Sequence, residues 1–222
     1  TPPCLERRVH EVTNRPDLDA VAFRTGLFRN VPGDTNRFLE VFTGEDAINR
    51  FLKFDIPWQT MGPIWRRSSL QRAGHQWNEH LLSWQDWEFH ILQLVYGLRV
   101  GQCGEVDCYW RMATAAGSIG RQHFSKRSIF NRVRLLGHIA DTFRGQGVMT
   151  PERQQILATL LFQHAFNYGC TFRQGRRLWA LGRRFRIVGH RQYYVTLAIE
   201  MLRRGCVRLE NNLYPHGCYL RP

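Results

Sequence analysis

A carboxylate stands at the start of an unusually aromatic segment, Trp-Gln-Asp-Trp-Glu-Phe-His, at residues 84–90. Ser83 is followed three positions later by Asp86, which predicts a capping box with Ser83 as the N-cap and Asp86 in the first helical turn. The positive end of the helix dipole favours an ionised carboxylate there, and such a group can accept a proton. Asp86 is therefore a candidate general base, although spacing alone favours a role as a helix cap.

The residues that follow Asp86 predict a buried helix. Apolar side chains recur at helical spacing at Trp87, Ile91, Leu94, Val95 and Leu98, and Phe89, Leu92 and Tyr96 cover much of the remaining surface. A helix that is apolar nearly all round is a buried one. We expect it to end at Gly97 or Arg99.

Three motifs occur in a fixed order around this helix. Residues 65–74 read Trp-Arg-Arg-Ser-Ser-Leu-Gln-Arg-Ala-Gly, residues 77–79 read Trp-Asn-Glu, and residues 85–87 read Gln-Asp-Trp. Together they resemble the acceptor half of family 2 glycosyltransferases, which have the GT-A fold, over roughly residues 3–120. The resemblance implies an inverting enzyme that moves a sugar from a nucleotide-sugar donor to a hydroxyl of a glycan or a lipid-linked saccharide. Asp86 would be its catalytic base.

The same resemblance implies an acceptor site. Its residues would be Trp58, Gly62, Trp65, Arg66 and Trp87. Aromatic faces in such a site stack on sugar rings. Packing in the hydrophobic core is an equally good interpretation of the tryptophans.

Asp17 and Asp19 form an Asp-X-Asp pair, the motif with which this family holds its divalent metal. We reject the pair as that site, because it follows Pro16 and runs directly into a buried strand. The family's metal motif instead precedes a helix like the one expected at residues 4–14. The resemblance therefore implies that the Mg or Mn ligands and the nucleotide-binding half lie outside this chain, before Thr1.

Residues 109–119 resemble the strand and loop that follow the base helix in this family. Arg111 would be a weak candidate for contacting a diphosphate or metal, while Ala113 stands where the family often has a histidine. His123 could replace that histidine from the adjoining loop. A solvated loop position is the more common situation for a lone histidine without a second ligand at fixed spacing.

The order of expected elements predicts an α/β fold. Helices at 4–14, 44–54 and 68–73 alternate with strands at 19–23 and 99–110. We expect the C-terminal part of a GT-A-like mixed sheet with flanking helices in a domain at residues 1–120, followed by a mainly helical, arginine-rich region at 121–222. The six cysteines show neither a Cys-X-X-Cys pair nor the density of a disulfide scaffold, which favours a reducing, cytoplasmic setting.

Charge is distributed very unevenly between the two regions. Residues 1–110 carry 12 Lys and Arg against 14 Asp and Glu, a net charge of −2, and residues 111–222 carry 19 against 4, a net charge of +15. The second region is expected to face an anionic partner.

Residues 175–188 interleave arginines with apolar residues and suit attachment to the inner face of an anionic membrane. A solvated arginine face over an ordinary helical core explains the pattern equally well. The alternative to a glycosyltransferase is thus a non-catalytic basic protein that binds an anionic membrane or nucleic acid. Nucleic acid is the less favoured partner, because no zinc finger, RNP-like motif or repeat is present.

Overall fold

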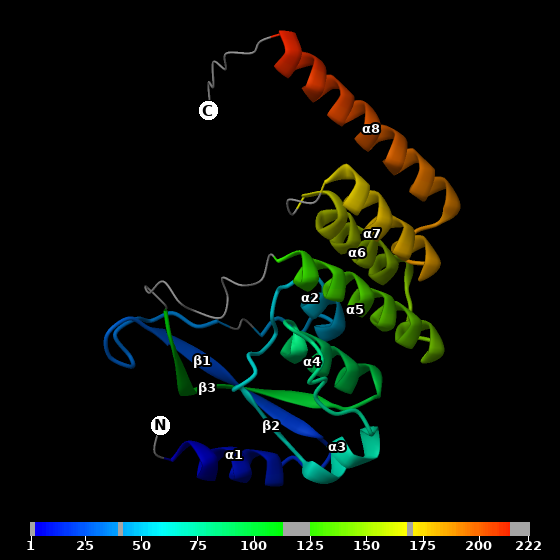
Figure 1. Cartoon of the computed structure of the whole chain (residues 1–222). Coiled ribbons are helices and arrows are strands. Elements are labelled where there is room, and N and C mark those ends of the chain that lie inside the picture. Colours follow the sequence, from blue (N-terminus) through cyan, green and yellow to red (C-terminus); the bar gives the residue numbers. More distant parts are fainter. Residues whose placement is uncertain (1–2, 40–41, 113–124, 168–170, 214–222) are drawn as a thin grey trace.

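The computed structural model describes residues 3–39, 42–112, 125–167 and 171–213, the side chains of residue 167 and of residues 204–213 excepted. It has a mixed α/β fold in which a three-stranded sheet is flanked by helices (Figure 1). The strands are β1 (Ala20–Phe28), β2 (Pro63–Trp65) and β3 (Val100–Arg111). The helices that accompany the sheet are α1 (Cys4–Thr13), α2 (Ala47–Leu52), α3 (Arg67–Ala73) and α4 (Gln85–Val95). The mainly helical second region contains α5 (Lys126–Gly145), α6 (Pro151–Phe162), a π-helical turn η2 (Gln163–Asn167), α7 (Phe172–Arg184) and α8 (His190–Leu213).

The central strand of the sheet is β1. It pairs antiparallel with β2 and parallel with β3, in the order β2-β1-β3. Successive side chains of a strand point to opposite faces. Val21 and Phe23 accordingly pack with Val12 of α1, while Ala22 joins the core on the α4 side. The sheet therefore lies between α1 and α4, as Figure 1 shows.

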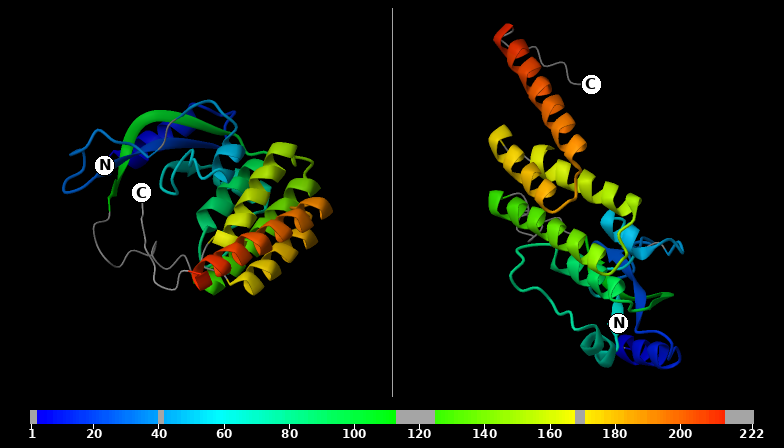
Figure 2. Two further views of the ribbon diagram at one scale, coloured as in Figure 1. Left: turned by 90° about the horizontal axis from the view of Figure 1, so that it is seen from above. Right: turned by 90° about the vertical axis from the view of Figure 1, so that its right-hand side faces the viewer.

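The larger hydrophobic core continues across residue 120. It joins Ala22, Trp87 of α4, Leu136 of α5 and Trp179 of α7 in a cluster of buried side chains. Further views show α6 and α7 side by side on the far side of α5 from the sheet, with α8 beyond them (Figure 2). Packing against α5 thus ties the sheet and α4 to the C-terminal helices.

Several elements form where the sequence places them, because local signals mark their ends. Gly74 adopts the left-handed conformation with φ 71° and ends α3, as a C-terminal glycine commonly does. Thr150 accepts a hydrogen bond from the Arg153 amide and Pro151 opens α6. The predicted strand at 99–110 is β3, and the predicted helix at 4–14 is α1. The helix expected at 44–54 is shorter and covers only residues 47–52.

The predicted capping box at Ser83 is wrong. Helix α4 begins at Gln85 with Trp84 as its N-cap, and no side-chain cap hydrogen bond is present there. The Ser83 hydroxyl instead accepts a hydrogen bond from Arg132 Nε at 3.0 Å and lies 3.3 Å from the Ser128 hydroxyl. A buried tertiary contact with α5 has replaced the local cap. Asp86 nevertheless lies in the first turn, and α4 ends at Val95, before Gly97.

The apolar side of α7 packs inside the protein. Leu178 and Trp179 are 6% and 1% exposed, whereas Arg176, Arg177 and Arg183 are exposed. This arrangement matches a solvated arginine face over a helical core. Within the described ranges, none of the helices combines the length and the apolar character that crossing a membrane requires.

Candidate active site

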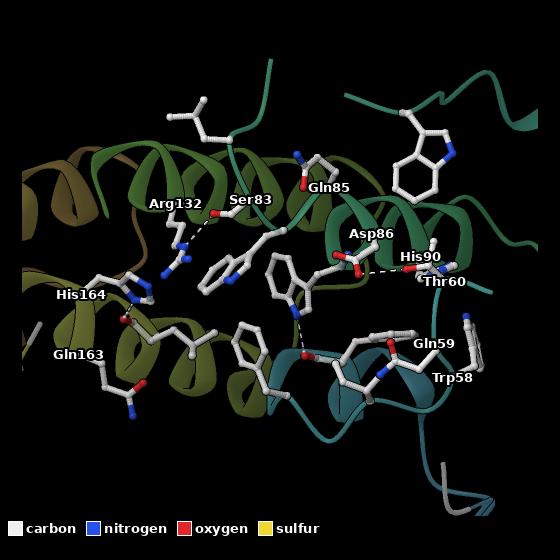
Figure 3. A pocket seen from close by; sticks show the side chains of 18 residues that line it. Trp58, Gln59, Thr60, Ser83, Gln85, Asp86, His90, Arg132, Gln163 and His164 are labelled. Atoms are coloured by element: carbon white, nitrogen blue, oxygen red, sulfur yellow. Dashed lines mark hydrogen bonds between the residues drawn. The ribbon is translucent and has the colours of Figure 1, made fainter. Parts of the chain in front are cut away.

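A cavity of about 840 Å³ opens where α4, α5 and η2 meet the segment after α2 (Figure 3). Its lining includes Asp86, Thr60, Trp84, His90, Arg132 and His164. Ligand sites for small molecules commonly have volumes of roughly 300–1,000 Å³ and mostly apolar walls with a few polar groups. This cavity has both properties, and it contains the carboxylate singled out from the sequence.

Both oxygens of Asp86 are held in place. The Thr60 hydroxyl donates to Oδ2 at 3.0 Å, and the backbone amide of Trp87 donates to Oδ1 at 2.8 Å. A carboxylate has about four lone-pair sites, so lone pairs remain for a further donor. The Asp86 side chain is exposed along the cavity wall and is within reach of a molecule bound there. This carboxylate is therefore oriented and accessible.

The wall beside Asp86 is aromatic. The Phe54 ring stacks on Trp87 with centroids 5.6 Å apart and an interplanar angle of 8°, and it contacts Trp84 at 4.8 Å. Trp87 is fixed further, because its Nε1 donates to the Phe51 carbonyl at 2.6 Å. These rings give the cavity a rigid apolar surface on which the face of a sugar ring could stack.

Two residues of this wall have strained backbones. Phe54 and Trp84 have φ of 59° and 70°. For a bulky residue this left-handed conformation costs on the order of 1–3 kcal/mol and persists where the surrounding packing imposes it. Such outliers cluster at functional sites. Their position in this wall supports the assignment of the cavity as the site.

His90 lies one helical turn after Asp86 and is 2% exposed. Its imidazole is stacked between Phe51, with centroids 5.6 Å apart, and Trp65, at 6.1 Å. Neither ring nitrogen has a hydrogen-bond partner among the described residues. Burial lowers the pKa of His90 to about 4, and the charge of Asp86 opposes that shift. The imidazole is therefore neutral near pH 7.

The other end of the cavity is built from α5 and η2. Arg132 is 4% exposed, and its guanidinium lies 4.7 Å from the centroid of the Trp84 ring. His164 Nδ1 lies 2.8 Å from the Leu160 carbonyl oxygen, and its ring meets Trp84 edge-on at 5.1 Å. Burial lowers the pKa of His164 to about 4, and the charge of Arg132 acts in the same direction. Among the described residues that line the cavity, Arg132 thus supplies a permanent positive charge beside the neutral His164.

Only some of the residues predicted for the acceptor site line the cavity. Trp58 and Trp87 line the cavity together with Asp86, whereas Trp65 lies behind His90. Gly62 is outside the lining, and a Cβ there would come within 2.9 Å of the Phe23 carbonyl oxygen. A close backbone contact with β1 therefore accounts for this glycine.

Arg66 also has a structural role. Its Nε donates to the Leu18 carbonyl at 2.9 Å, and its Nη2 donates to the carbonyls of Val12 and Arg15. These bonds hold the turn between α1 and β1 and lie outside the cavity lining.

Of the two candidates for a diphosphate or metal contact, only Arg111 lies among the described residues. Arg111 ends β3 with its guanidinium 5.0 Å from the centroid of the Phe28 ring, and it is absent from the lining. His123 lies outside the described residues. Both assignments therefore stay predictions from the resemblance.

The Asp19 carboxylate has a structural role. Oδ1 accepts hydrogen bonds from Ser69 at 2.6 Å and Arg72 at 2.7 Å, and Oδ2 accepts one from the Arg99 amide at 2.8 Å. The carboxylate thereby joins α3 to the start of β3. Across the residues that the structure describes, no group of three or more His, Cys, Asp or Glu side chains could hold a metal ion. The Asp17-X-Asp19 pair does not fit a divalent metal, because both oxygens of Asp19 already accept hydrogen bonds from the protein.

Sequence reasoning missed Thr60, His90, Arg132 and His164. Two of them carried a detectable signal. His90 follows Asp86 by four residues and so shares its helix face. Arg132 stands three residues after Ile129 and one before Val133, within the apolar stripe of α5, where a charged residue is unexpected.

In comparisons with known proteins, the chain matches no family model and no curated protein.

Proposed function

We propose that this chain forms the acceptor-binding and catalytic-base part of an inverting glycosyltransferase with a GT-A-like fold. The observation that carries the proposal is the Asp86 carboxylate, oriented by Thr60 and the Trp87 amide in the wall of an aromatic cavity. The family resemblance of residues 65–87 supports the same role for this residue.

In the proposed reaction, Asp86 accepts the proton of an acceptor hydroxyl. The resulting oxygen attacks the anomeric carbon of the donor sugar from the face opposite the nucleotide diphosphate, which departs with the bonding electron pair. Configuration at that carbon is inverted. General-base catalysis requires the acceptor hydroxyl within hydrogen-bond reach of the carboxylate, roughly 2.6–3.2 Å between heavy atoms. Asp86 lines the cavity and has more acceptor sites than the hydrogen bonds from Thr60 and Trp87 use, so it can make such a contact.

Aromatic side chains would hold the acceptor against the base. Phe54 and Trp84 line the cavity, and we expect their rings to contact the apolar face of a sugar ring. Residues that bind the nucleotide-sugar donor and its Mg or Mn ion belong, in this proposal, to a part of the enzyme outside this chain.

The direct test is a transfer assay on the protein expressed from its complete coding sequence. Labelled nucleotide sugars are offered together with a panel of saccharide acceptors, and the linkage of the product is analysed by NMR. The proposal expects transfer with inversion of anomeric configuration. Retention of configuration with every active donor would contradict it.

A second candidate function is binding to an anionic membrane surface, favoured by the exposed arginines of α7. Trp179 cannot make apolar contact with a membrane, because it is 1% exposed. Helix α8 instead presents Val195, Ile199 and Leu202 at 50%, 57% and 70% exposure. These residues share one helix face. Helices α7 and α8 are joined where Arg183 Nη1 donates to the Tyr194 hydroxyl at 3.2 Å.

If this surface binds membranes, charge and apolar contact should contribute separately. Replacing Arg176, Arg177, Arg183 and Arg184 by Gln should weaken binding to vesicles that contain anionic lipid, since each basic residue near such a surface contributes about 1 kcal/mol. Replacing Ile199 and Leu202 by Ser should weaken it at high salt as well. Vesicle co-sedimentation measures both effects. Binding that is unchanged in both variants would exclude this surface.

A further inference from the structure

Exposed apolar side chains gather around the candidate site. Phe54, Trp77 and Leu82 all line the cavity, and they are 39%, 44% and 49% exposed. We call these three residues the apolar rim. Single exposed apolar residues are common on protein surfaces, whereas several around one cavity mark a place where an apolar group binds.

Two segments contribute to the apolar rim. Phe54 follows α2, whereas Trp77 and Leu82 belong to the segment between α3 and α4. Trp77 lies flat on Phe89 of α4, with ring centroids 4.5 Å apart and an interplanar angle of 1°. Leu82 directly precedes Ser83, which is buried and accepts a hydrogen bond from α5. Packing against the neighbouring helices therefore fixes the rim residues in place.

The backbone of Phe54 gives an independent indication of a ligand. Its φ of 59° is strained for a bulky residue, and strain of this kind persists mainly at functional sites. One side of the ring packs on Trp87, with centroids 5.6 Å apart, yet the ring stays well exposed. The strained backbone thus holds an apolar ring at the cavity and not in the core.

The polar part of the same cavity contains Asp86 and Thr60, which Figure 3 shows side by side. Leu82 differs from both, since it has no hydrogen-bonding group for a hydroxyl and no aromatic face for a sugar ring. An aliphatic chain suits it, because covering apolar surface is favourable in water. A ligand that matches both parts of the cavity is a saccharide with an apolar chain.

We propose that the apolar rim binds the hydrocarbon chain of a lipid-linked acceptor, while the saccharide of the same molecule lies beside Asp86. This inference rests on the proposed function for the identity of the ligand as an acceptor. It narrows the acceptor from any saccharide to one that carries a lipid. The exposed apolar face of α8 is a separate feature that suits a protein working at a membrane surface.

Alkyl glucosides test the inference on the 222-residue chain without any transfer reaction. Octyl β-glucoside, kept below the concentration at which it forms micelles, is compared with methyl β-glucoside by calorimetry. The two probes share a sugar and differ only in the chain. Each methylene that becomes fully buried strengthens binding about fourfold. Because the rim covers a chain only in part, we expect octyl β-glucoside to bind about tenfold more tightly or better.

Variants with a matched control separate the rim from general binding of alkyl chains. Leu82→Ser should weaken binding of octyl β-glucoside by about fivefold and leave that of methyl β-glucoside unchanged. Leu5→Ser is the control, because Leu5 is 69% exposed on α1, on the other side of the sheet from α4, and does not line the cavity. It should change neither affinity. Trp77→Ser repeats the test at a second rim residue, and Leu82→Ser decides should that variant fail to fold.

Two outcomes would overturn the inference: equal binding of the two glucosides, including no binding of either, and an equal loss of octyl β-glucoside affinity in Leu82→Ser and Leu5→Ser. Circular dichroism checks that each variant is folded. The transfer assay separates the inference from the proposed function. Transfer to water-soluble saccharides as fast as to alkyl glycosides would leave the proposed function standing and overturn the inference. Tight, Leu82-dependent binding of octyl β-glucoside by a protein that transfers no sugar would support the rim as a chain-binding site and contradict the proposed function alone.

Discussion

Replacing Asp86 by Asn is expected to abolish sugar transfer by the protein expressed from its complete coding sequence. A general base contributes about 10²- to 10⁴-fold to the rate, and an amide cannot accept the proton. Asn keeps the shape of Asp, and its Oδ1 can still accept the hydrogen bond from the Trp87 amide. The initial rate of transfer, measured with acceptor in excess, should therefore fall by at least two orders of magnitude while the midpoint of thermal unfolding changes little.

Thr60→Val provides the matched control for this substitution. It removes the hydroxyl that donates to Asp86 Oδ2 at 3.0 Å but leaves the base in place. We expect Thr60→Val to lose much less activity than Asp86→Asn. The acceptor concentration that gives half of the maximal rate should be the same as in the parent protein. Transfer by Asp86→Asn within a few-fold of the parent protein would show that Asp86 only supports the start of α4.

His90→Phe is expected to make the protein markedly more resistant to acid. Burial lowers the pKa of His90 from 6.5 to about 4 in the folded state. Above about pH 6.5 the imidazole is neutral in both states and has no effect on the pH dependence. As the pH falls from about 6.5 to about 4, the unfolded chain binds the proton first, so the free energy of unfolding decreases. The lowered pKa corresponds to roughly 3 kcal/mol lost over this range.

Phenylalanine suits the position, because it can keep the stacking between Phe51 and Trp65 and removes two buried nitrogens without described partners. Denaturant unfolding at about pH 7 and about pH 4.5 measures the effect as the difference between the two proteins. His164 has its pKa lowered to about 4 as well, so His90→Phe should retain part of the acid sensitivity. An identical loss of stability on acidification in parent and variant would mean that His90 is protonated as readily in the fold as outside it.

Local sequence signals were sufficient where an element depends on its own residues. The apolar run at residues 20–23 forms part of β1, and the Thr150-Pro151 pair opens α6 with the hydroxyl of Thr150 as cap. Gly74 ends α3 because it alone can take the left-handed conformation there without strain. The sequence also placed Asp86 in the first turn of a largely buried helix. These features are set by steric preference, by capping and by the period of apolar residues, all of which act over a few positions.

Tertiary packing decided what those residues do. Ser83 has the spacing of an N-cap, but its hydroxyl accepts a hydrogen bond from Arg132, 49 residues away, and does not cap the helix. Trp179 had the pattern of a membrane-facing residue and is instead 1% exposed, because α7 needs an apolar face to pack on α5 and α6.

The cavity is a tertiary feature throughout. Its wall combines Thr60, which follows α2, with Asp86 of α4, Arg132 of α5 and His164 of η2, and no local pattern relates these four positions. Burial then changes the chemistry of its members, since the same imidazole that titrates near pH 6.5 in an unfolded chain stays neutral down to about pH 4 at His90. The sequence by itself determined a carboxylate at a helix start. The packing of distant segments determined that this carboxylate shares an aromatic cavity with a buried cation, because the wall of a cavity is formed by every element that surrounds it.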